Sequence, residues 1–247
     1  MFEPAKGGIG VIGCHGRLGR RIVAQARRRG IGVVYEKTRR GEVATGRPAV
    51  LIDASDAASL SDNVALAAQL DCALVVAVSN RSVEGNRTLE AAAAERGVLV
   101  ADNLAFGHYL QRRVAGLIAG LIAAAPAEAD VAAEVTVIDR HPVTKRDAPS
   151  GTAKELARLL TRPGFAPSVQ CLRQGLPTSE HRIEVALANE TLSVVHDVRS
   201  FDVAASGALL AAAWLSRRPG PGLWTMDDVY SDDAGAPLPA AVRGKEL

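Results

Sequence analysis

Aromatic side chains are scarce in this sequence, and neither sign of charge is in clear excess. Phe, Trp and Tyr make up 4% of the 247 residues, and 29 basic residues against 27 acidic ones leave a formal net charge of +2. Nucleic-acid binding needs a basic face, and single strands also need aromatic platforms for base stacking. The composition therefore argues against a nucleic-acid partner.

Cysteines are equally few. Cys14, Cys72 and Cys171 are far apart in the chain and form no CxxC pair. They indicate neither a zinc site nor a disulfide framework, and a reducing compartment fits them best. Because acidic residues and histidines do not cluster at the spacing of metal ligands, we predict no metal.

Long apolar runs are absent too. The most apolar stretch, residues 114–125, is shorter than the ~20 residues of a membrane span, and we expect it to form a buried core helix. Residues 1–8 lack the apolar segment of a signal peptide. We therefore expect a cytoplasmic protein that does not associate with membranes.

The first half of the chain alternates short apolar segments with helical ones, within a globular composition of 48% hydrophobic residues. Continuous apolar strands separated by helices predict a parallel sheet covered on both faces, the doubly wound Rossmann-type fold. The expected strands are 9–12, 32–35, 50–53, 72–78 and 98–101, and the expected helices are 17–29, 57–70 and 83–96.

The second half has a different pattern, which predicts a separate α+β domain. Apolar and polar residues alternate on both sides of Asn189-Glu190, as in an antiparallel hairpin. We expect strands at 134–138, 169–173, 182–188 and 191–198, helices at 152–160 and 206–215, and a short apolar end at 223–230. The tail after Ser231 is rich in Pro, Ala and Gly, and we expect it to be loosely ordered.

Three glycines follow the first expected strand and open the first helix, with the spacing Gly13-x-x-Gly16-x-x-Gly19. This is a variant of the dinucleotide-binding GxGxxG turn, in which glycines allow a tight turn, close approach of the pyrophosphate and helix–strand packing. The helix N-terminus adds a partial positive charge. Glu36, expected at the end of the second strand, suits the adenosine ribose hydroxyls.

Lys37, Arg39 and Arg40 follow that acid and suit a 2′-phosphate, so the sequence predicts NADH or NADPH as cofactor. The alternative is that the glycines only make a turn and that the basic run is a solvated loop. Asp53 and residues 77–80 end the third and fourth strands, where ligands of parallel sheets bind. Strand-to-helix caps would use the same residue types.

Residues 141–153 are the most informative segment of the second half. His141 and Lys145 follow a strand, and Thr152 and Glu155 have capping-box spacing, which predicts a helix beginning near Thr152. The helix N-terminus and Lys145 would suit a carboxylate, with His141 nearby as a general acid. The alternative is a surface loop in front of a well-capped helix.

The segment from Lys145 to Ala153 resembles the signature of the dihydrodipicolinate reductase family, in which two histidines and two spacers precede Lys-x-Asp-Ala-Pro-Ser-Gly-Thr-Ala. The glycine turn with Arg17 and the closing segments 211–215 and 222–229 resemble the same family. The resemblance implies NADH- or NADPH-dependent reduction of 4-hydroxy-tetrahydrodipicolinate, a cyclic imine dicarboxylate, to tetrahydrodipicolinate in lysine and diaminopimelate biosynthesis.

The family likeness also implies an organisation and a homotetramer. Residues 1–107 would bind the dinucleotide, 108–207 would bind substrate and build the oligomer, and 208–247 would return to the first domain. His141 and Lys145 would be catalytic, and Lys145, Ser150, Gly151 and Thr152 would bind substrate. The expected cofactor residues are Gly13, His15, Gly16, Arg17, Leu18, Gly19, Glu36, Lys37, Asp53, Ala77, Val78, Ser79 and Asn103.

Three positions depart from the family pattern. Pro142 replaces the second histidine, Ala77-Val78-Ser79-Asn80 replaces Gly-Thr-Thr-Gly, and Arg199-Ser200-Phe201 replaces Ser-Arg followed by an aromatic residue. These departures leave open a reductase of a different cyclic imine. A non-catalytic dinucleotide-binding sensor is a third hypothesis, which the retention of both His141 and Lys145 disfavours.

Overall fold

The computed structural model describes residues 7–125, 133–162, 165–175 and 179–232. Among these residues the chain forms two compact units, the first from residues 7–105 together with 201–232, and the second from residues 106–200. Almost all of the tail after Ser231, for which we expected loose order, lies outside the described residues, as do residues 1–6.

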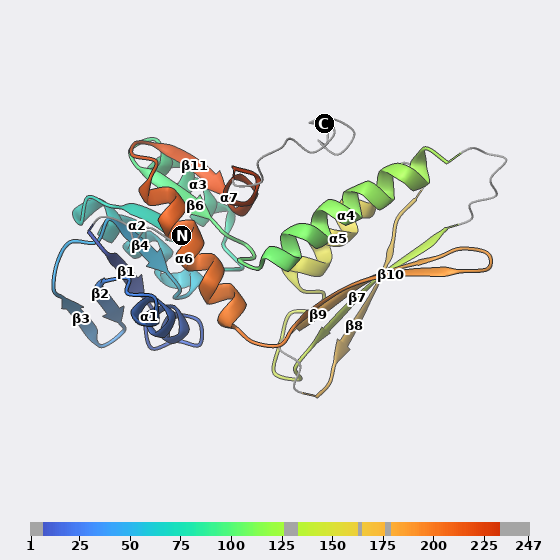
Figure 1. Ribbon diagram of the computed structural model, residues 1–247, viewed down its shortest axis with the longest axis horizontal. Coiled ribbons are helices and arrows are strands. Elements are labelled where there is room, and N and C mark those ends of the chain that lie inside the picture. Colours follow the sequence, from blue (N-terminus) through green and yellow to red (C-terminus); the bar gives the residue numbers. More distant parts are fainter. Residues whose placement is uncertain (1–6, 126–132, 163–164, 176–178, 233–247) are drawn as a thin grey trace. The chain divides into compact units, whose positions relative to one another are not determined.

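The first unit is built on a seven-stranded sheet with the order β11-β6-β5-β4-β1-β2-β3 (Figure 1). All neighbouring strands are parallel except β3, which runs antiparallel to β2. The Rossmann-type sheet predicted from the apolar alternation is thus confirmed. Its strands are β1 (Ile9–Ile12), β2 (Val33–Thr38), β3 (Gly41–Ala44), β4 (Val50–Asp53), β5 (Ala73–Val76), β6 (Gly97–Val100) and β11 (Gly222–Thr225).

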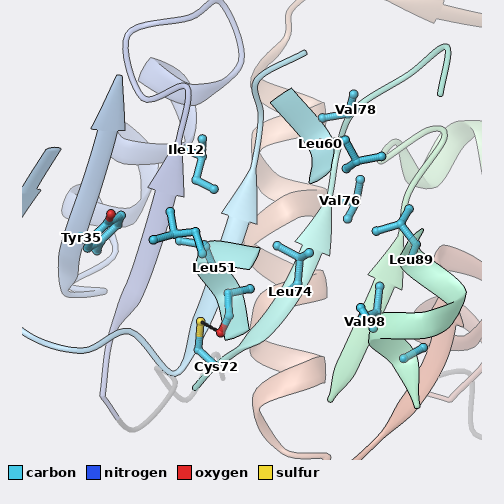
Figure 2. Close-up of a cluster of buried hydrophobic side chains, with 14 residues drawn as sticks. Ile12, Tyr35, Leu51, Leu60, Cys72, Leu74, Val76, Val78, Leu89 and Val98 are labelled. Atoms are coloured by element: carbon cyan, nitrogen blue, oxygen red, sulfur yellow. Dashed lines mark hydrogen bonds between the residues drawn. The ribbon is translucent and has the colours of Figure 1, made fainter. Parts of the chain in front are cut away.

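Helices pack against this sheet, as expected for parallel strands joined by crossovers. Contacts join α1 to α6, and α2 to α3. Leu60 of α2 and Leu89 of α3 pack with Leu51, Leu74 and Val98 of the strands in one buried cluster (Figure 2). The helices are α1 (Gly19–Arg28), the 3₁₀ turn η1 (Ala57–Ser59), α2 (Leu60–Gln69), α3 (Val83–Ala93), α6 (Asp202–Ser216) and α7 (Met226–Asp232).

The second unit has a four-stranded sheet with the order β10-β9-β7-β8. β9 pairs antiparallel with both β7 and β10, and β8 lies parallel to β7. Alternate residues of β7 face a core that includes Val137, Ile183 and Leu156. The strands are β7 (Glu134–His141), β8 (Ser168–Arg173), β9 (Ser179–Ala186) and β10 (Thr191–Val198), and the helices are α4 (Phe106–Ala123) and α5 (Gly151–Leu160).

The structure corrects the expected buried helix at 114–125. Helix α4 is longer and amphipathic: Ala115 and Ile118 face the core, whereas Leu117 is 43% and Leu121 62% exposed. The sequence did not reveal this asymmetry, because leucine and alanine occur on both faces of the helix. Within the described part of the chain, no helix is both long and apolar enough to cross a membrane.

Two strands of the first unit were not expected from the sequence. β3 forms a hairpin with β2, which extends β2 to Thr38 and places Glu36 inside the strand rather than at its end. β11 pairs with β6 at the other edge of the sheet. The chain re-enters the first unit at Phe201, before α6, because α6 is one continuous helix against this unit's sheet.

Candidate active site

The glycine turn of the first unit is closely packed against its own backbone. Gly13 has φ +72°, and a Cβ there would lie 2.7 Å from the carbonyl oxygen of Ala54. A Cβ on Gly19 would lie 2.1 Å from the carbonyl oxygen of Gly13. Only glycine satisfies both positions, so the turn brings β1, α1 and the loop after β4 closer than side chains would allow.

The start of α1 is open to an anion. Leu18 occupies the N-cap without a side-chain hydrogen bond, and the first turn has no acidic residue to offset the helix dipole. His15, Gly16 and Arg17 are exposed, and the Arg17 guanidinium lies 5.4 Å from the ring centroid of Phe201. This turn fits the pyrophosphate of a nicotinamide dinucleotide.

The glycine turn is tied to β2, which carries the candidate ribose-binding residues. The amides of Gly13 and Cys14 donate to the carbonyl of Lys37 at 2.9 and 3.3 Å. Glu36 lies 2.6 Å from the Arg27 guanidinium, so its charge is already paired within the unit. An acidic and a basic residue therefore follow one another on the strand next to the turn, a sequence compatible with either NADH or NADPH.

Asp53 is fully buried and has a structural role. Its carboxylate accepts from the amide and hydroxyl of Ser55 and, at 3.0 Å, from the Asn63 side chain. Burial raises the pKa of Asp53, and these hydrogen bonds oppose that rise. These bonds tie the end of β4 to Ser55 and to α2, whereas the N-cap of η1 is Asp56.

The loops after β5 and β6 are held by hydrogen bonds. Val78 is buried in the hydrophobic core, so its side chain is not available to a ligand. Ala77 is half-buried, and Ser79 is exposed. Arg81 donates to the Val78 carbonyl and pairs with Asp102 at 2.7 Å. Asn103 accepts from the Ala105 amide at 3.0 Å. Of the side chains in the 77–79 loop, Ser79 is the best placed for a cofactor.

In the second unit, His141 ends β7 and is buried, with its side chain 9% exposed, on the same face as Asp139. The Nε2 of His141 lies 2.9 Å from Oδ1 of Asp139, an ion-pair contact when the ring is protonated rather than an aligned hydrogen bond. The Nε2 of His181 on β9 lies 3.2 Å from the same oxygen. Asp139 is thus the centre of a buried polar cluster.

Hydrogen bonds to Asp139 come from two further elements. Ser150 donates to its two carboxylate oxygens from the amide at 2.9 Å and from the hydroxyl at 2.7 Å, and Arg173 of β8 donates at 2.8 Å. Burial opposes ionisation, but His141, His181, Arg173 and Ser150 outweigh it and hold the pKa of Asp139 far below its usual range.

Helix α5 begins at Gly151, next to Thr152 as expected, but Thr152 is not its N-cap as the capping-box spacing suggested. The N-cap is Ser150, whose extended backbone places its hydroxyl 3.2 Å from the Ala153 amide. The Glu155 carboxylate instead pairs with the side chains of His108 and Arg112, at 3.1 and 2.8 Å. Gly151 is exposed, and Thr152 is half-buried in the first turn, which has no acidic residue.

Lys145 lies in the loop between β7 and α5. Its amide donates to the Pro142 carbonyl at 3.0 Å. Its side chain is 30% exposed, and the ammonium lies 2.8 Å from the Asp147 carboxylate. Burial would raise the pKa of Asp147, but the Lys145 contact lowers it overall. Lys145 is therefore an accessible cation whose present partner is another loop residue.

Of the remaining histidines of the second unit, His108 and His181 are buried and His196 is half-buried. Burial lowers the pKa of His181, with Asp139 opposing, and burial together with His108 and His181 lowers the pKa of His196 to about 4. His15, in the first unit, is exposed on the glycine turn.

Asp139, His141 and His181 offer ligand atoms within 4.8 Å of one another, a group that the sequence spacing did not reveal. Arg173 and Ser150 already donate to the carboxylate, and the guanidinium would repel a bound cation. The group is therefore better matched to holding protons than to holding a metal.

The sequence did not reveal the roles of Asp139 and Arg173, or the contact between His181 and Asp139. A signal for Asp139 was present, because residues two apart on a strand share a face and His141 follows it at that spacing. Arg173 and His181 come from other strands, so only the sheet register brings them to Asp139.

Comparisons with known proteins show the family of this chain. The family described as dihydrodipicolinate reductase, C-terminus, matches residues 115–230. The 4-hydroxy-tetrahydrodipicolinate reductase of Gluconobacter oxydans is 31% identical, covering 89% of this chain and 95% of the relative. That of Zymomonas mobilis is 27% identical, covering 93% and 99%.

A solved structure shares the fold. Dipicolinate-bound dihydrodipicolinate reductase from Paenisporosarcina sp. TG-14 matches with a TM-score of 0.63 at 16% identity, covering 88% of this chain and 96% of that one. Sequence likeness over nearly the full length of the curated relatives, together with this fold, assigns the family: the chain belongs to the 4-hydroxy-tetrahydrodipicolinate reductases.

Proposed function

We propose that the protein is an oxidoreductase that uses NADH or NADPH to reduce 4-hydroxy-tetrahydrodipicolinate to tetrahydrodipicolinate in lysine and diaminopimelate biosynthesis. The observation that carries this proposal is the buried His141 next to a loop that presents Lys145 and the start of α5. The names of the curated relatives support the same substrate.

The glycine turn of the first unit would hold the cofactor. The amides at the start of α1 suit the pyrophosphate, and Glu36 and Lys37 suit the adenosine ribose with or without its 2′-phosphate. Ser79 is the exposed side chain of the 77–79 loop. A reduced nicotinamide, when bound, supplies the hydride for the substrate's unsaturated ring.

The second unit would hold the diacid. Lys145 would exchange Asp147 for one substrate carboxylate, and Ser150, Gly151 and Thr152 at the positive end of α5 would bind the other. His141, or Lys145, would supply the proton that balances the hydride, and the substrate hydroxyl leaves as water. The reaction requires the ligands of the two units to meet, which makes correct orientation a large part of the rate enhancement.

An assay with freshly generated substrate tests the proposal. Oxidation of NADH or NADPH that depends on this substrate is the expected result, and parallel titrations define the cofactor preference. Cofactor binding without turnover of this substrate would contradict the proposal. Turnover of a related cyclic imine instead would point to the other reductase, for which Pro142 in place of the second family histidine is the motivating departure.

We further propose that the protein is cytoplasmic and forms a homotetramer through the second unit, as the family resemblance implies. Light scattering coupled to size-exclusion chromatography measures the assembly directly. A mass close to four times the 25.8 kDa chain is expected, and a monomer at micromolar concentration would contradict the proposal.

A further inference from the structure

Asp139 connects more elements than any other polar residue of the candidate site. It lies near the end of β7 and is 0% exposed. Donors reach its carboxylate from Ser150, before α5, and from Arg173, on β8, while His141 and His181 contact it from β7 and β9. A buried charge is stable only when such partners surround it.

Asp139 contacts both the proposed proton donor and the residue that precedes the proposed carboxylate-binding site. On one side the carboxylate lies 2.9 Å from the ring nitrogen of His141, the proposed proton donor. On the other it fixes the amide and hydroxyl of Ser150, whose hydroxyl also caps α5 at the Ala153 amide. The proposed carboxylate cradle begins at the next residue, Gly151.

Arg173 extends the same network to the loop. Its guanidinium donates to the Asp139 carboxylate at 2.8 Å, to the Asp139 carbonyl at 2.9 Å and to the Asp147 carbonyl at 2.6 Å. Asp147 is in turn the partner of Lys145. His141 and Ser150 therefore contact Asp139 directly, and Lys145 is linked to it through Asp147 and Arg173.

We propose that Asp139 is a positioning residue, whose carboxylate holds the His141 ring and the start of α5 in one arrangement so that proton donor and carboxylate cradle act on the same substrate. The proposal rests on the proposed function for the roles of His141 and Gly151. Asp139 itself does not touch the substrate. It acts through His141, Ser150 and Arg173, as outer partners orient ligating or catalytic histidines elsewhere.

The test compares Asp139→Asn with Val137→Ala in the full-length protein. Asparagine keeps the shape and removes the charge. Val137 is equally buried, on the same strand and the same face two residues earlier, and its truncation destabilises the unit without touching the polar cluster. Four quantities are measured for each: kcat, KM, cofactor affinity, and the ¹⁵N signals of the histidine rings.

Asp139→Asn is expected to lower kcat by about 10- to 100-fold relative to Val137→Ala, the usual cost of removing an outer partner. KM should rise as well, because Ser150 loses its anchor, while cofactor affinity in the first unit stays within about twofold, an effect too small to reflect a lost contact. The ring signals of His141 and His181 should move only in Asp139→Asn. Equal kcat and unchanged ring signals in the two variants would overturn the proposal.

The kcat–pH profile provides a readout that a purely structural residue would not move. Asp139→Asn removes the negative charge that lies 2.9 Å from the ring nitrogen of the proposed proton donor, so its kcat–pH profile should be displaced from that of the unmodified protein, whereas Val137→Ala should leave the profile in place. An identical profile counts against the proposal. The other titratable or charged groups around this ring are His181, Arg173, Cys171, Lys145 and Asp147.

Failure of the proposed function is distinguishable from failure of this inference. If the unmodified protein does not turn over the substrate, dipicolinate binding and the histidine signals still test Asp139. Weaker dipicolinate binding with shifted ring signals in Asp139→Asn keeps the positioning role, and no change in either removes it. Should Asp139→Asn not fold, Arg173→Gln is the deciding variant, and unchanged His141 signals there would overturn the proposal.

Discussion

Lys145 and His141 have different surroundings although only three residues separate them. His141 is nearly buried and contacts a carboxylate that is itself inaccessible to solvent. Lys145 is 30% exposed and pairs with Asp147 on the same loop. A cation on an exposed loop can change partners at little cost, whereas a buried ring keeps one orientation. The first is suited to capturing a carboxylate and the second to transferring a proton.

Replacing Lys145 tests this division at the level of one side chain. Lys145→Ala should lower kcat/KM by about 10- to 150-fold, because a hydrogen bond to a charged group contributes about 1.5–3 kcal/mol. Cofactor affinity should stay nearly unchanged. Steady-state kinetics and cofactor titration check both, with Arg146→Ala, an exposed neighbouring cation, as the control. Equal loss of turnover and of cofactor affinity would assign Lys145 to the other site.

The charge of Glu36 should affect the preference for NADH or NADPH. Its carboxylate is paired with Arg27 and precedes Lys37. Glu36→Ala should favour NADPH relative to NADH by roughly tenfold, since it removes a charge that repels a 2′-phosphate, a difference of about 1.4 kcal/mol. The ratio of the two dissociation constants, measured by fluorescence titration, is the readout. An unchanged ratio would show that the ribose does not approach β2.

Close packing between elements decides where glycine is required. In α6, a Cβ on Gly207 would lie 1.9 Å from the Leu104 carbonyl oxygen, so the helix packs against backbone there. In α4, nothing lies within 4 Å of a Cβ built on Gly116. The two glycines lie within helices and differ only in their tertiary surroundings, which makes them a matched pair.

Gly207→Ala should therefore destabilise the first unit by about 2 kcal/mol or more, as overpacking displaces α6. Gly116→Ala should instead stabilise the second unit by about 0.5–1 kcal/mol, through the helix propensity of alanine. Urea unfolding monitored for each variant measures both values. A neutral Gly207→Ala would mean that α6 does not approach Leu104 as closely as the structure shows.

Across the whole molecule, histidines are distributed unevenly: four of the five are in the second unit. The pKa of His196 is lowered to about 4 from its ordinary 6.5 by burial and by the neighbouring His108 and His181. The unfolded chain therefore binds more protons than the folded one between these values, and stability rises with pH there.

The second unit should consequently lose stability as pH falls from 6.5 toward 4, on the order of 2 kcal/mol for His196 alone. The carboxylates of Asp139 and Glu155, whose pKa values are lowered by their partners despite burial, add a further loss at still lower pH. Thermal unfolding followed across this pH range is the measurement. His196→Asn should flatten the dependence, and a dependence as steep as before would exclude His196 as its source.

The alternation of apolar strands and helices was sufficient to predict the Rossmann-type sheet and the separate α+β region. Periodicity is a local property, and each central strand is buried on both faces. The edge strands β3 and β11 were not predicted because both are short, β3 is exposed throughout and β11 is exposed at alternate residues. Pairing with a neighbouring strand, rather than composition, makes them strands.

The candidate site was likewise predictable from the sequence only in part. Its glycine turn and the loop from Lys145 to Thr152 were recognisable because turn and cap chemistry depend on adjacent residues. The N-cap was misplaced at Thr152 because Ser150 is selected by its bonds to Asp139, eleven residues earlier. The burial of Val78 and Asp53 was equally invisible, since it depends on what other strands and helices cover.

By itself, then, the sequence determined the fold class, the glycine turn and the loop that carries His141 and Lys145, all of which follow from local spacing. Only the tertiary structure decided that a carboxylate on β7 gathers an arginine from β8, a histidine from β9 and the cap of α5 around one buried charge. The physical reason is that desolvating a charge requires several donors at once, and only folding brings donors from separate elements together.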